Sequence, residues 1–302
     1  MAISRRKMMQ ASLLCAGAAF GHGYGLWAET ATGPDIENTL RTIEAGTGGR
    51  LGVALLDAEG KLLAGWRQEE HFPMCSTFKV LAVSALLARV DRGEEHLDRV
   101  VHFQQSDLVP YSPETSLHVD TGMTVGEICR AAIAHSDNTA ANIILASLGG
   151  PAGVTAWARH LDDAVTRLDR TETSLNEGTP GDPRDTTAPA HMAEDLRKVT
   201  TGDVLSAASR AQLTAWLEAN TTGKARIRAA LPAGWRIGDK TGTGDHRTAN
   251  DVAVIWPSAP TGSMLPGPVF LAIYLTEAKV EFPMQEAAIA SVARAFVEQR
   301  LI

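Results

Sequence analysis

Ser76-Thr77-Phe78-Lys79 opens a strongly helical segment and places a hydroxyl and an amine three residues apart. Residues i and i+3 of a helix share one face. A lysine whose charge is suppressed by burial and by neighbouring cations can take the serine proton, so that the serine oxygen becomes a nucleophile. The spacing alone is weak evidence, because a capping serine followed by a solvated lysine occurs on many helices. Its meaning depends on the motifs that follow it in the chain.

Three further motifs follow in chain order. They are Ser136-Asp137-Asn138, then Glu172 within the segment 170–176, then Lys240-Thr241-Gly242. Ser-x-x-Lys, Ser-Asp-Asn and Lys-Thr-Gly together are typical of class A β-lactamases and penicillin-binding proteins. With the Glu172 segment added, the chain resembles a class A serine β-lactamase over nearly all of its length, from about residue 35 to the C-terminus.

The hydrophobic pattern divides the chain into strand-rich ends and a helical middle. The middle, from residue 76 to about 217, has mainly helical apolar spacing interrupted by proline and glycine. Helices are also predicted at 35–45 and 283–300. Apolar runs bounded by turn residues predict strands at 51–57, 61–67, 236–243, 251–256 and 269–276. The two ends of the chain therefore share a sheet around a helical insert.

The resemblance implies an α/β (α+β) fold. In that family an antiparallel five-stranded sheet, flanked by helices and built from both termini, packs against an all-α domain, and the active site lies between them. Residues 29–68 and 219–302 would form the α/β domain, and residues 69–218 the all-α domain. The second range carries the Ser-x-x-Lys, Ser-Asp-Asn and Ω-loop motifs.

The resemblance also implies the roles of the catalytic residues. Ser76 would attack the β-lactam carbonyl, and the backbone N–H groups of Ser76 and Thr243 would form the oxyanion hole. Ser136 would pass a proton to the departing lactam nitrogen. The proton acceptor during acylation is either Lys79 or Glu172, an alternative that the residues leave open.

Glu172 separates two enzyme classes that share the other motifs. A penicillin-binding transpeptidase keeps the acyl-serine, whereas a β-lactamase brings water to the ester, and Glu172 with Asn176 could position and deprotonate that water. Arg170 and Asp185 match the ion pair that closes the family's Ω-loop. Relatives often have proline after this glutamate, with a cis peptide bond. Here Thr173 follows, so the bond is either trans or an unfavourable cis bond.

Substrate contacts are predicted along the strand that carries Lys-Thr-Gly. Lys240 would supply positive charge near the substrate carboxylate, and Thr241 and Thr243 would add hydroxyl groups. Because a strand alternates its faces, Lys240 and Gly242 point one way and the two threonines the other. Gly242 leaves room for a ligand to lie against the strand.

Three predicted contacts come from other segments. Asn138 would offer its amide to the substrate's acylamide group, and Tyr111 resembles the family's aromatic wall, although an exposed loop aromatic would give the same sequence. Many relatives bind the carboxylate through an arginine where this chain has Ala249. Others use the position of Arg226, to which we assign the contact, and a plain surface arginine is the alternative.

The N-terminus has the features of an export signal. Two arginines and a lysine at 5–7 precede a small and apolar run at 11–20, which resembles a twin-arginine signal. We therefore interpret residues 1–28 as a signal peptide and expect a periplasmic location. The run is too short for a membrane anchor, which needs about 18–20 apolar residues, so no stable membrane insertion is expected.

Signal removal would leave two cysteines, Cys75 and Cys129. Many relatives pair the Cys129 position with one that is Val83 here. Some carbapenem-hydrolysing relatives bridge the Cys75 position to one that is Gly244 here. Since neither partner is present, we interpret Cys75 as a small buried hydrophobe and not as a redox or catalytic thiol.

Composition and missing motifs exclude several other functions. The formal net charge of −7 disfavours a polyanionic partner such as nucleic acid. No convincing zinc-ligand spacing, Gly-x-Ser-x-Gly elbow or Walker loop occurs, so neither a metal nor another cofactor is expected. The expected partners are β-lactam antibiotics, namely penicillins and cephalosporins, and a monomer is the family default. A DD-peptidase and a penicillin-binding sensor module remain the rival functions, and carbapenem turnover is left open.

Overall fold

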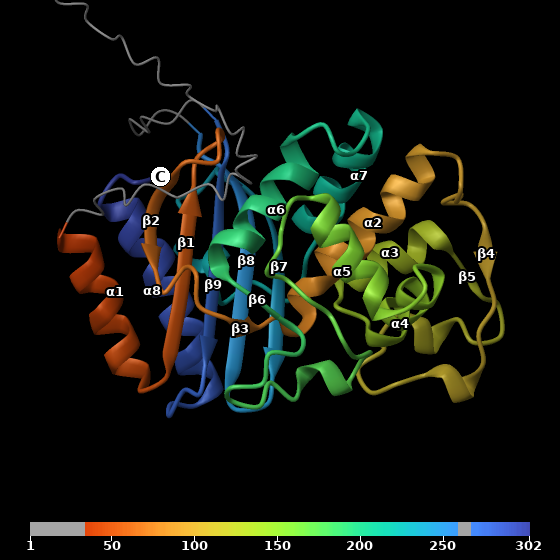
Figure 1. The fold of residues 1–302 in the computed structure, drawn as a ribbon, viewed down its shortest axis with the longest axis horizontal. Coiled ribbons are helices and arrows are strands. Elements are labelled where there is room, and N and C mark those ends of the chain that lie inside the picture. The colour runs from red at the N-terminus through yellow and green to blue at the C-terminus, as the bar shows by residue number, and fades with distance from the viewer. Residues whose placement is uncertain (1–33, 259–266) are drawn as a thin grey trace, which may run out of the picture.

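The computed structural model describes residues 34–258 and 267–302 (Figure 1). The predicted signal peptide, residues 1–28, lies outside the described residues. Within them, no helix combines the length and the apolar character needed to cross a membrane.

A five-stranded sheet forms one side of the molecule, in the order β2-β1-β9-β8-β7, and every neighbouring pair is antiparallel. Its strands are β1 (Arg50–Leu56), β2 (Leu62–Trp66), β7 (Arg236–Gly244), β8 (Thr248–Trp256) and β9 (Val269–Thr276). The predicted antiparallel sheet built from both ends of the chain is therefore confirmed. The strand β8 begins earlier than the predicted residue 251, because its first residues are small or polar and yet buried.

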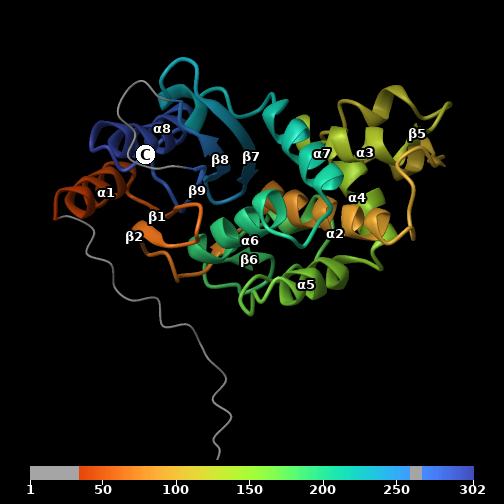
Figure 2. The same cartoon turned by 90° about the horizontal axis from the view of Figure 1, so that it is seen from above.

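Helices cover both faces of the sheet, as the view from above shows (Figure 2). The helices α1 (Pro34–Thr47) and α8 (Phe282–Glu298) lie on one face, and α6 (Pro189–Thr201) lies on the other. Alternate residues of β9 belong to two separate apolar cores: Leu271 joins the core under α1 and α8, while Phe270 joins the core of the helical part. This two-residue period follows from the alternation of side chains along a strand.

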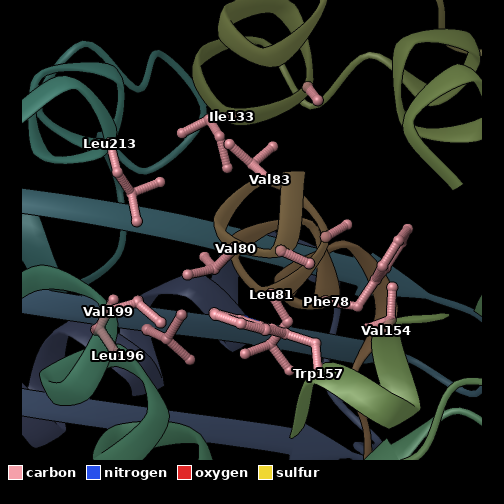
Figure 3. Close-up of a cluster of buried hydrophobic side chains, with 14 of the residues drawn as sticks. Phe78, Val80, Leu81, Val83, Ile133, Val154, Trp157, Leu196, Val199 and Leu213 are labelled. Carbon is pink, nitrogen blue, oxygen red and sulfur yellow. The ribbon is translucent and has the colours of Figure 1, made fainter. Parts of the chain in front are cut away.

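The helical part packs around one central helix, α2 (Lys79–Asp91). Its neighbours are α3 (Val125–Ala134), α4 (Asn138–Ser147), α5 (Pro151–His160), α6 and α7 (Ala207–Glu218). Residues 79–88 of α2 are buried on every side, as expected of a helix that is apolar all round. Figure 3 shows apolar side chains from the start of α2 surrounded by Ile133 of α3, Trp157 of α5, Leu196 of α6 and Leu213 of α7.

Several short elements have no counterpart in the predicted pattern. Two-residue strands pair β3 (Phe72–Pro73) with β6 (Thr186–Thr187), and β4 (Val100–Val101) with β5 (Met123–Thr124). Short 3₁₀ turns occur at Cys75–Phe78, Gln105–Asp107, Thr115–Leu117, Ser174–Asn176 and Ile227–Ala230. The pair β3–β6 connects the segment before Ser76 to the end of the predicted Ω-loop.

The fold predicts a large stability difference between two leucine truncations. Leu81→Ala should lower the free energy of unfolding by about 2–5 kcal/mol, because Leu81 is fully buried on α2 and its loss leaves a cavity. Leu117→Ala, at a side chain that is 75% exposed, should change it by less than about 0.5 kcal/mol. Urea-induced unfolding measures both changes. Equal losses in the two variants would contradict the placement of α2 at the centre of the core.

Candidate active site

A cavity of about 620 Å³ opens where the edge strand β7 meets the helical part. Most of the predicted site residues line it, namely Ser76, Tyr111, Ser136, Asn138, Asn176, Arg226, Thr241 and Thr243. The other predicted residues lie behind this wall: Lys79, Glu172 and Lys240 are buried, and Gly242 packs against the backbone of Met74. The structure thus brings together residues from the whole length of the folded chain.

Ser76 lies in the 3₁₀ turn Cys75–Phe78, and α2 begins only at Lys79. The helical segment that Ser76 was predicted to open therefore begins as a 3₁₀ turn, and the α-helix follows it. Ser76 and Lys79 still share one face, because a 3₁₀-helix has three residues per turn and aligns residues i and i+3. Lys79 Nζ lies 3.0 Å from Ser76 Oγ. Cys75, just before the serine, has a φ of +46°, a strained value of the kind found at functional sites.

Lys79 is a fully buried amine with five oxygen neighbours. Its Nζ donates to the backbone carbonyl of Ser136 at 2.8 Å and to Asn138 Oδ1 at 2.7 Å. It also lies 3.0 Å from Glu172 Oε1, and neither side chain of this ion pair is exposed. Burial lowers the pKa of Lys79, and the charge of Glu172 opposes that shift without reversing it.

Ser136 Oγ lies between two buried amines. Lys240 Nζ donates to it at 2.9 Å and Lys79 Nζ at 3.4 Å. Burial, reinforced by the positive charge of Lys79, holds the pKa of Lys240 well below its usual value. Ser136 has a φ of +57°, and the next residue, Asp137, fixes this turn by capping α4 and by accepting a backbone N–H bond from Thr115.

Glu172 is held at both its side chain and its backbone. Ser76 Oγ donates to Glu172 Oε1 at 3.3 Å, and Asn176 Nδ2 donates to Oε2 at 2.6 Å. The backbone N–H and carbonyl of Glu172 both pair with the side-chain amide of Asn142, each at 2.9 Å. The peptide bond between Glu172 and Thr173 is cis, which answers the question that the sequence left open.

Asn142 was not among the predicted residues. It follows Asn138 by four residues on α4, so both side chains share the face that meets the site. That spacing was the available signal. A second asparagine one turn after a Ser-Asp-Asn motif is a candidate partner for whatever backbone crosses that face.

The Ω-loop is closed by the expected pair. Arg170 Nε donates to Asp185 Oδ2 at 2.6 Å, and the backbone N–H groups of Asp169 and Arg170 donate to Oδ1 at 2.8 and 2.9 Å. Asp185 is buried, and its backbone carbonyl accepts from the Met74 N–H at 2.9 Å. The Asp185 carboxylate therefore holds the two ends of the loop together, and its backbone carbonyl connects them to the segment that carries the nucleophile.

Arg226 is a lining residue of the cavity and is almost completely buried. Its Nη1 donates to the carbonyls of Gly242 and Asn250 at 2.8 and 2.6 Å, and its Nη2 donates to Thr243 Oγ1 at 2.8 Å. Its Nε lies 3.3 Å from Glu286 Oε1. Arg226 is therefore not a free surface arginine, and its charge reaches the cavity mainly through the Thr243 hydroxyl.

Some residues of the cavity wall were missed by the sequence argument: Thr221, Thr222, Phe282 and Glu286. Phe282 and Glu286 are four residues apart at the start of α8, so one helical face presents both. The Phe282 ring lies under the Arg226 guanidinium at 5.5 Å. The two threonines come from the segment after α7, where nothing in the sequence indicates a site.

Both described cysteines, Cys75 and Cys129, are free and buried. Burial raises the pKa of each thiol, so neither is a thiolate at neutral pH. A Cβ on Gly244 would lie 2.6 Å from Cys75 Sγ, which shows how near the missing disulfide partner would be. Among residues 34–258 and 267–302, no cluster of His, Cys, Asp or Glu could hold a metal ion.

The arrangement suits a serine nucleophile. Ser76 Oγ contacts an amine and a carboxylate at once, and a second hydroxyl, Ser136, lies within reach of the same amine. Buried charges around an accessible hydroxyl are typical of catalytic sites. The strand β7 is the edge of its sheet, so one edge of its backbone is free of strand pairing beside the cavity.

Comparisons of sequence and of structure both find β-lactamases. A sequence profile of the beta-lactamase enzyme family matches residues 35–300. The chain is 45% identical to beta-lactamase CTX-M-8 of Citrobacter amalonaticus over 86% of this chain and 87% of that protein. It is 44% identical to beta-lactamase OXY-2 of Klebsiella oxytoca over 90% and 91%. A solved structure of an ancestral class A beta-lactamase superposes with a TM-score of 0.84 and 54% identity, covering 87% of this chain and 99% of that one.

The buried ion pair predicts how Lys79 titrates. Glu172→Gln should lower the pKa of Lys79 further, because the carboxylate charge that raises it is removed while the desolvation remains. NMR of enzyme labelled with ¹³C in the lysine side chains measures this pKa, and the Lys79→Met variant assigns the signal. An unchanged or raised Lys79 pKa in Glu172→Gln would mean that the two groups do not form the ion pair in solution.

Proposed function

Because this chain belongs to the class A serine β-lactamases, we propose that it hydrolyses the β-lactam amide of penicillins and cephalosporins through an acyl-enzyme on Ser76. The members of this family are serine hydrolases. One observation carries the mechanism: Ser76 Oγ lies within hydrogen-bond reach of both Lys79 and Glu172. A proton can therefore leave the serine directly into a buried pair of titratable groups.

The hydrogen bonds favour Glu172 as the final acceptor of that proton. Lys79 faces the Ser136 carbonyl and Asn138 Oδ1, which only accept, so its Nζ must donate to both. A neutral amine could also make these two bonds, but the Glu172 carboxylate lies 3.0 Å away and stabilises the charged form, so Lys79 is proposed to start as an ammonium ion. Ser76 either gives its proton to Glu172 directly, or gives it to Lys79 after Lys79 has protonated Glu172. Both routes end with the proton on Glu172.

Collapse of the tetrahedral intermediate needs an acid for the lactam nitrogen. Ser136 is proposed for this step, since its Oγ lies 2.9 Å from Lys240 Nζ and 3.4 Å from Lys79 Nζ, and the two amines can replace the proton that it gives. The developing oxyanion is proposed to bind the backbone N–H groups of Ser76 and Thr243. Loss of one such donor commonly costs about 10²–10³ in rate.

Deacylation is assigned to water activated by Glu172. Asn176 donates to Glu172 Oε2, and its own Oδ1 is buried without a hydrogen-bond partner among the described residues. A water between these two side chains could donate one proton to each oxygen. This carboxylate–amide pair supports a hydrolase over a DD-peptidase, which forms the same acyl-serine without rapid hydrolysis.

The remaining residues are proposed to orient the substrate. Thr241 and Thr243 present hydroxyls to the substrate carboxylate, with the charges of Lys240 and Arg226 behind them. Asn138 is assigned to the acylamide group, although its Nδ2 also donates to the Pro110 carbonyl at 2.8 Å.

Tyr111, 59% exposed, is assigned to the outer wall of the cavity. The predicted role of Gly242 is corrected: a Cβ there would lie 2.7 Å from the Met74 carbonyl oxygen, so this glycine lets β7 pack against the segment before Ser76 and not against a ligand. We further propose that the enzyme acts as a monomer in the periplasm, reached by the twin-arginine route, and there confers β-lactam resistance.

Glu172→Gln tests the two halves of catalysis. The amide keeps the size of the side chain but cannot act as the base, and general-base catalysis is commonly worth about 10²–10⁴ in rate. Deacylation should slow far more than acylation, so the variant should trap a penicilloyl adduct that mass spectrometry detects on Ser76. Ser76→Ala is the matched control and should show no adduct. If Glu172→Gln hydrolysed the substrate at the wild-type rate and showed no adduct, Glu172 would not be the base for deacylation.

Arg226→Ala tests the carboxylate contact. The variant should lose about 1.5–3 kcal/mol in kcat/KM for benzylpenicillin, the range for a hydrogen bond to a charged group. The methyl ester of benzylpenicillin lacks that charge and should lose much less, which separates recognition from general damage to the Arg226–Gly242 and Arg226–Asn250 contacts. If kcat/KM fell equally for the acid and the ester, Arg226 would only stabilise β7 and would not bind the substrate carboxylate.

A further inference from the structure

A chain of hydrogen bonds leads from the protein interior to the wall of the active-site cavity and ends on Thr241. Thr222 Oγ1 lies 2.6 Å from Thr241 Oγ1 and 2.8 Å from Asn220 Oδ1. Asn220 Nδ2 in turn donates to the buried Asp239 carboxylate at 2.6 Å. Thr222 and Thr241 both line the cavity, whereas Asn220 is buried behind them. We call Asn220, Thr222 and Thr241 the threonine relay.

The direction of the threonine relay follows from the groups that can only donate or only accept. The backbone N–H of Thr222 faces Asn220 Oδ1 at 3.0 Å, which identifies that atom as the amide oxygen. An amide oxygen only accepts, so the Thr222 hydroxyl uses its one proton to donate to it. Thr222 Oγ1 then has only lone pairs left for its neighbour. The Thr241 hydroxyl therefore donates to Thr222 and not to a ligand.

Thr243, on the same face of β7, has the opposite arrangement. Arg226 Nη2 donates to Thr243 Oγ1 at 2.8 Å, and a guanidinium only donates, so Thr243 keeps its own proton. No second hydrogen bond of Thr243 Oγ1 occurs in the described part of the chain. Thr243 is also an exposed residue, whereas Thr241 is only 5% exposed. Thr243 can thus donate to an anion without breaking any contact.

Thr241 can donate to an anion only if the threonine relay reverses. A carboxylate accepts and does not donate, so the Thr241 proton would have to turn toward it. Thr222 would then donate to Thr241, and Thr222 Oγ1 would face Asn220 Oδ1 at 2.8 Å with two acceptors opposed. The reversal loses one neutral hydrogen bond, which commonly changes an equilibrium constant by about two- to tenfold.

We propose that Thr222 is a positioning residue that weakens carboxylate binding: by accepting the Thr241 proton, it leaves Thr243 as the main hydroxyl donor to the substrate carboxylate. This inference deepens the proposed function and rests on it, because it takes the substrate carboxylate to meet β7. The direction of the threonine relay in the free enzyme depends on no substrate.

Neutron diffraction from perdeuterated, ligand-free enzyme tests the direction of the threonine relay. The Thr241 deuteron should point to Thr222 Oγ1, and the Thr222 deuteron should point to Asn220 Oδ1. A Thr222 deuteron that points to Thr241 would overturn the proposal. Because this measurement needs no substrate, it decides the direction of the relay whether or not the chain binds a β-lactam.

The effect on recognition is measured in Ser76→Ala enzyme, which cannot be acylated, by NMR titration with benzylpenicillin and with its methyl ester. Thr222→Val keeps the shape of the side chain and frees the Thr241 proton. Asn220 Oδ1 still accepts the backbone N–H of residue 222, so no buried amide oxygen is left unpaired. Thr222→Val should strengthen benzylpenicillin binding at least about twofold and change ester binding less. Thr222→Ser, which restores the hydroxyl, should remove this gain.

A double-mutant cycle assigns the gain to Thr241. In Ser76→Ala enzyme, Thr241→Val should weaken benzylpenicillin binding less than Thr243→Val does. Combined with Thr222→Val, the loss from Thr241→Val should grow at least about twofold, because the freed hydroxyl now binds the carboxylate.

Two results of the titrations would overturn the proposal alone: weaker benzylpenicillin binding in Thr222→Val, or equal losses from Thr241→Val with and without Thr222→Val. If the Ser76→Ala enzyme bound neither benzylpenicillin nor its ester, the proposed function itself would be wrong, and the role of Thr222 in carboxylate binding with it. The two failures are therefore distinguishable.

Discussion

The site is organised around one buried ion pair, Lys79 with Glu172. Neither side chain is exposed, so each charge depends on the other and on the hydrogen bonds around it. Loss of one partner from such a pair commonly costs about 3–5 kcal/mol, because the remaining charge is left uncompensated. The pair connects α2 to the Ω-loop. Lys79 also donates hydrogen bonds to Ser136 and Asn138 of the helical part. Reactivity and local structure therefore depend on the same contact.

The sheet contributes the other wall of the site and does so from its edge. Since β7 is the last strand in the order, its outer backbone edge and the side chains of Thr241 and Thr243 meet the helical part instead of another strand. The Arg226 guanidinium binds two carbonyls, on β7 and β8, and fixes that edge from behind. An exposed edge strand can pair with a strand of another chain. Here the helical part and the residues that line the cavity lie beside β7.

The sequence predicted the sheet, the main helices and most of the cavity wall, because long periodic segments and spaced motifs carry their own signal. The sequence did not predict elements that depend on contacts between distant parts of the chain. The strands of the β3–β6 pair are two residues long and have no period, and Ser76 lies in a 3₁₀ turn that the helical pattern does not distinguish from α-helix. Asn142, Phe282 and Glu286 were missed because their importance depends on which backbone or cation the fold brings to them.

The position of β9 has a consequence for synthesis on the ribosome. This strand lies between β1 and β8 in the sheet, yet it is the last strand to be synthesised. More than 200 residues separate β1 from β9, so the β1–β2 hairpin is made long before β1 can pair with β9. The helical part, whose contacts are closer in sequence, can form first. The nascent hairpin β1–β2 meanwhile leaves the apolar edge of β1 unpaired, and such an edge is prone to aggregation until β9 has been made.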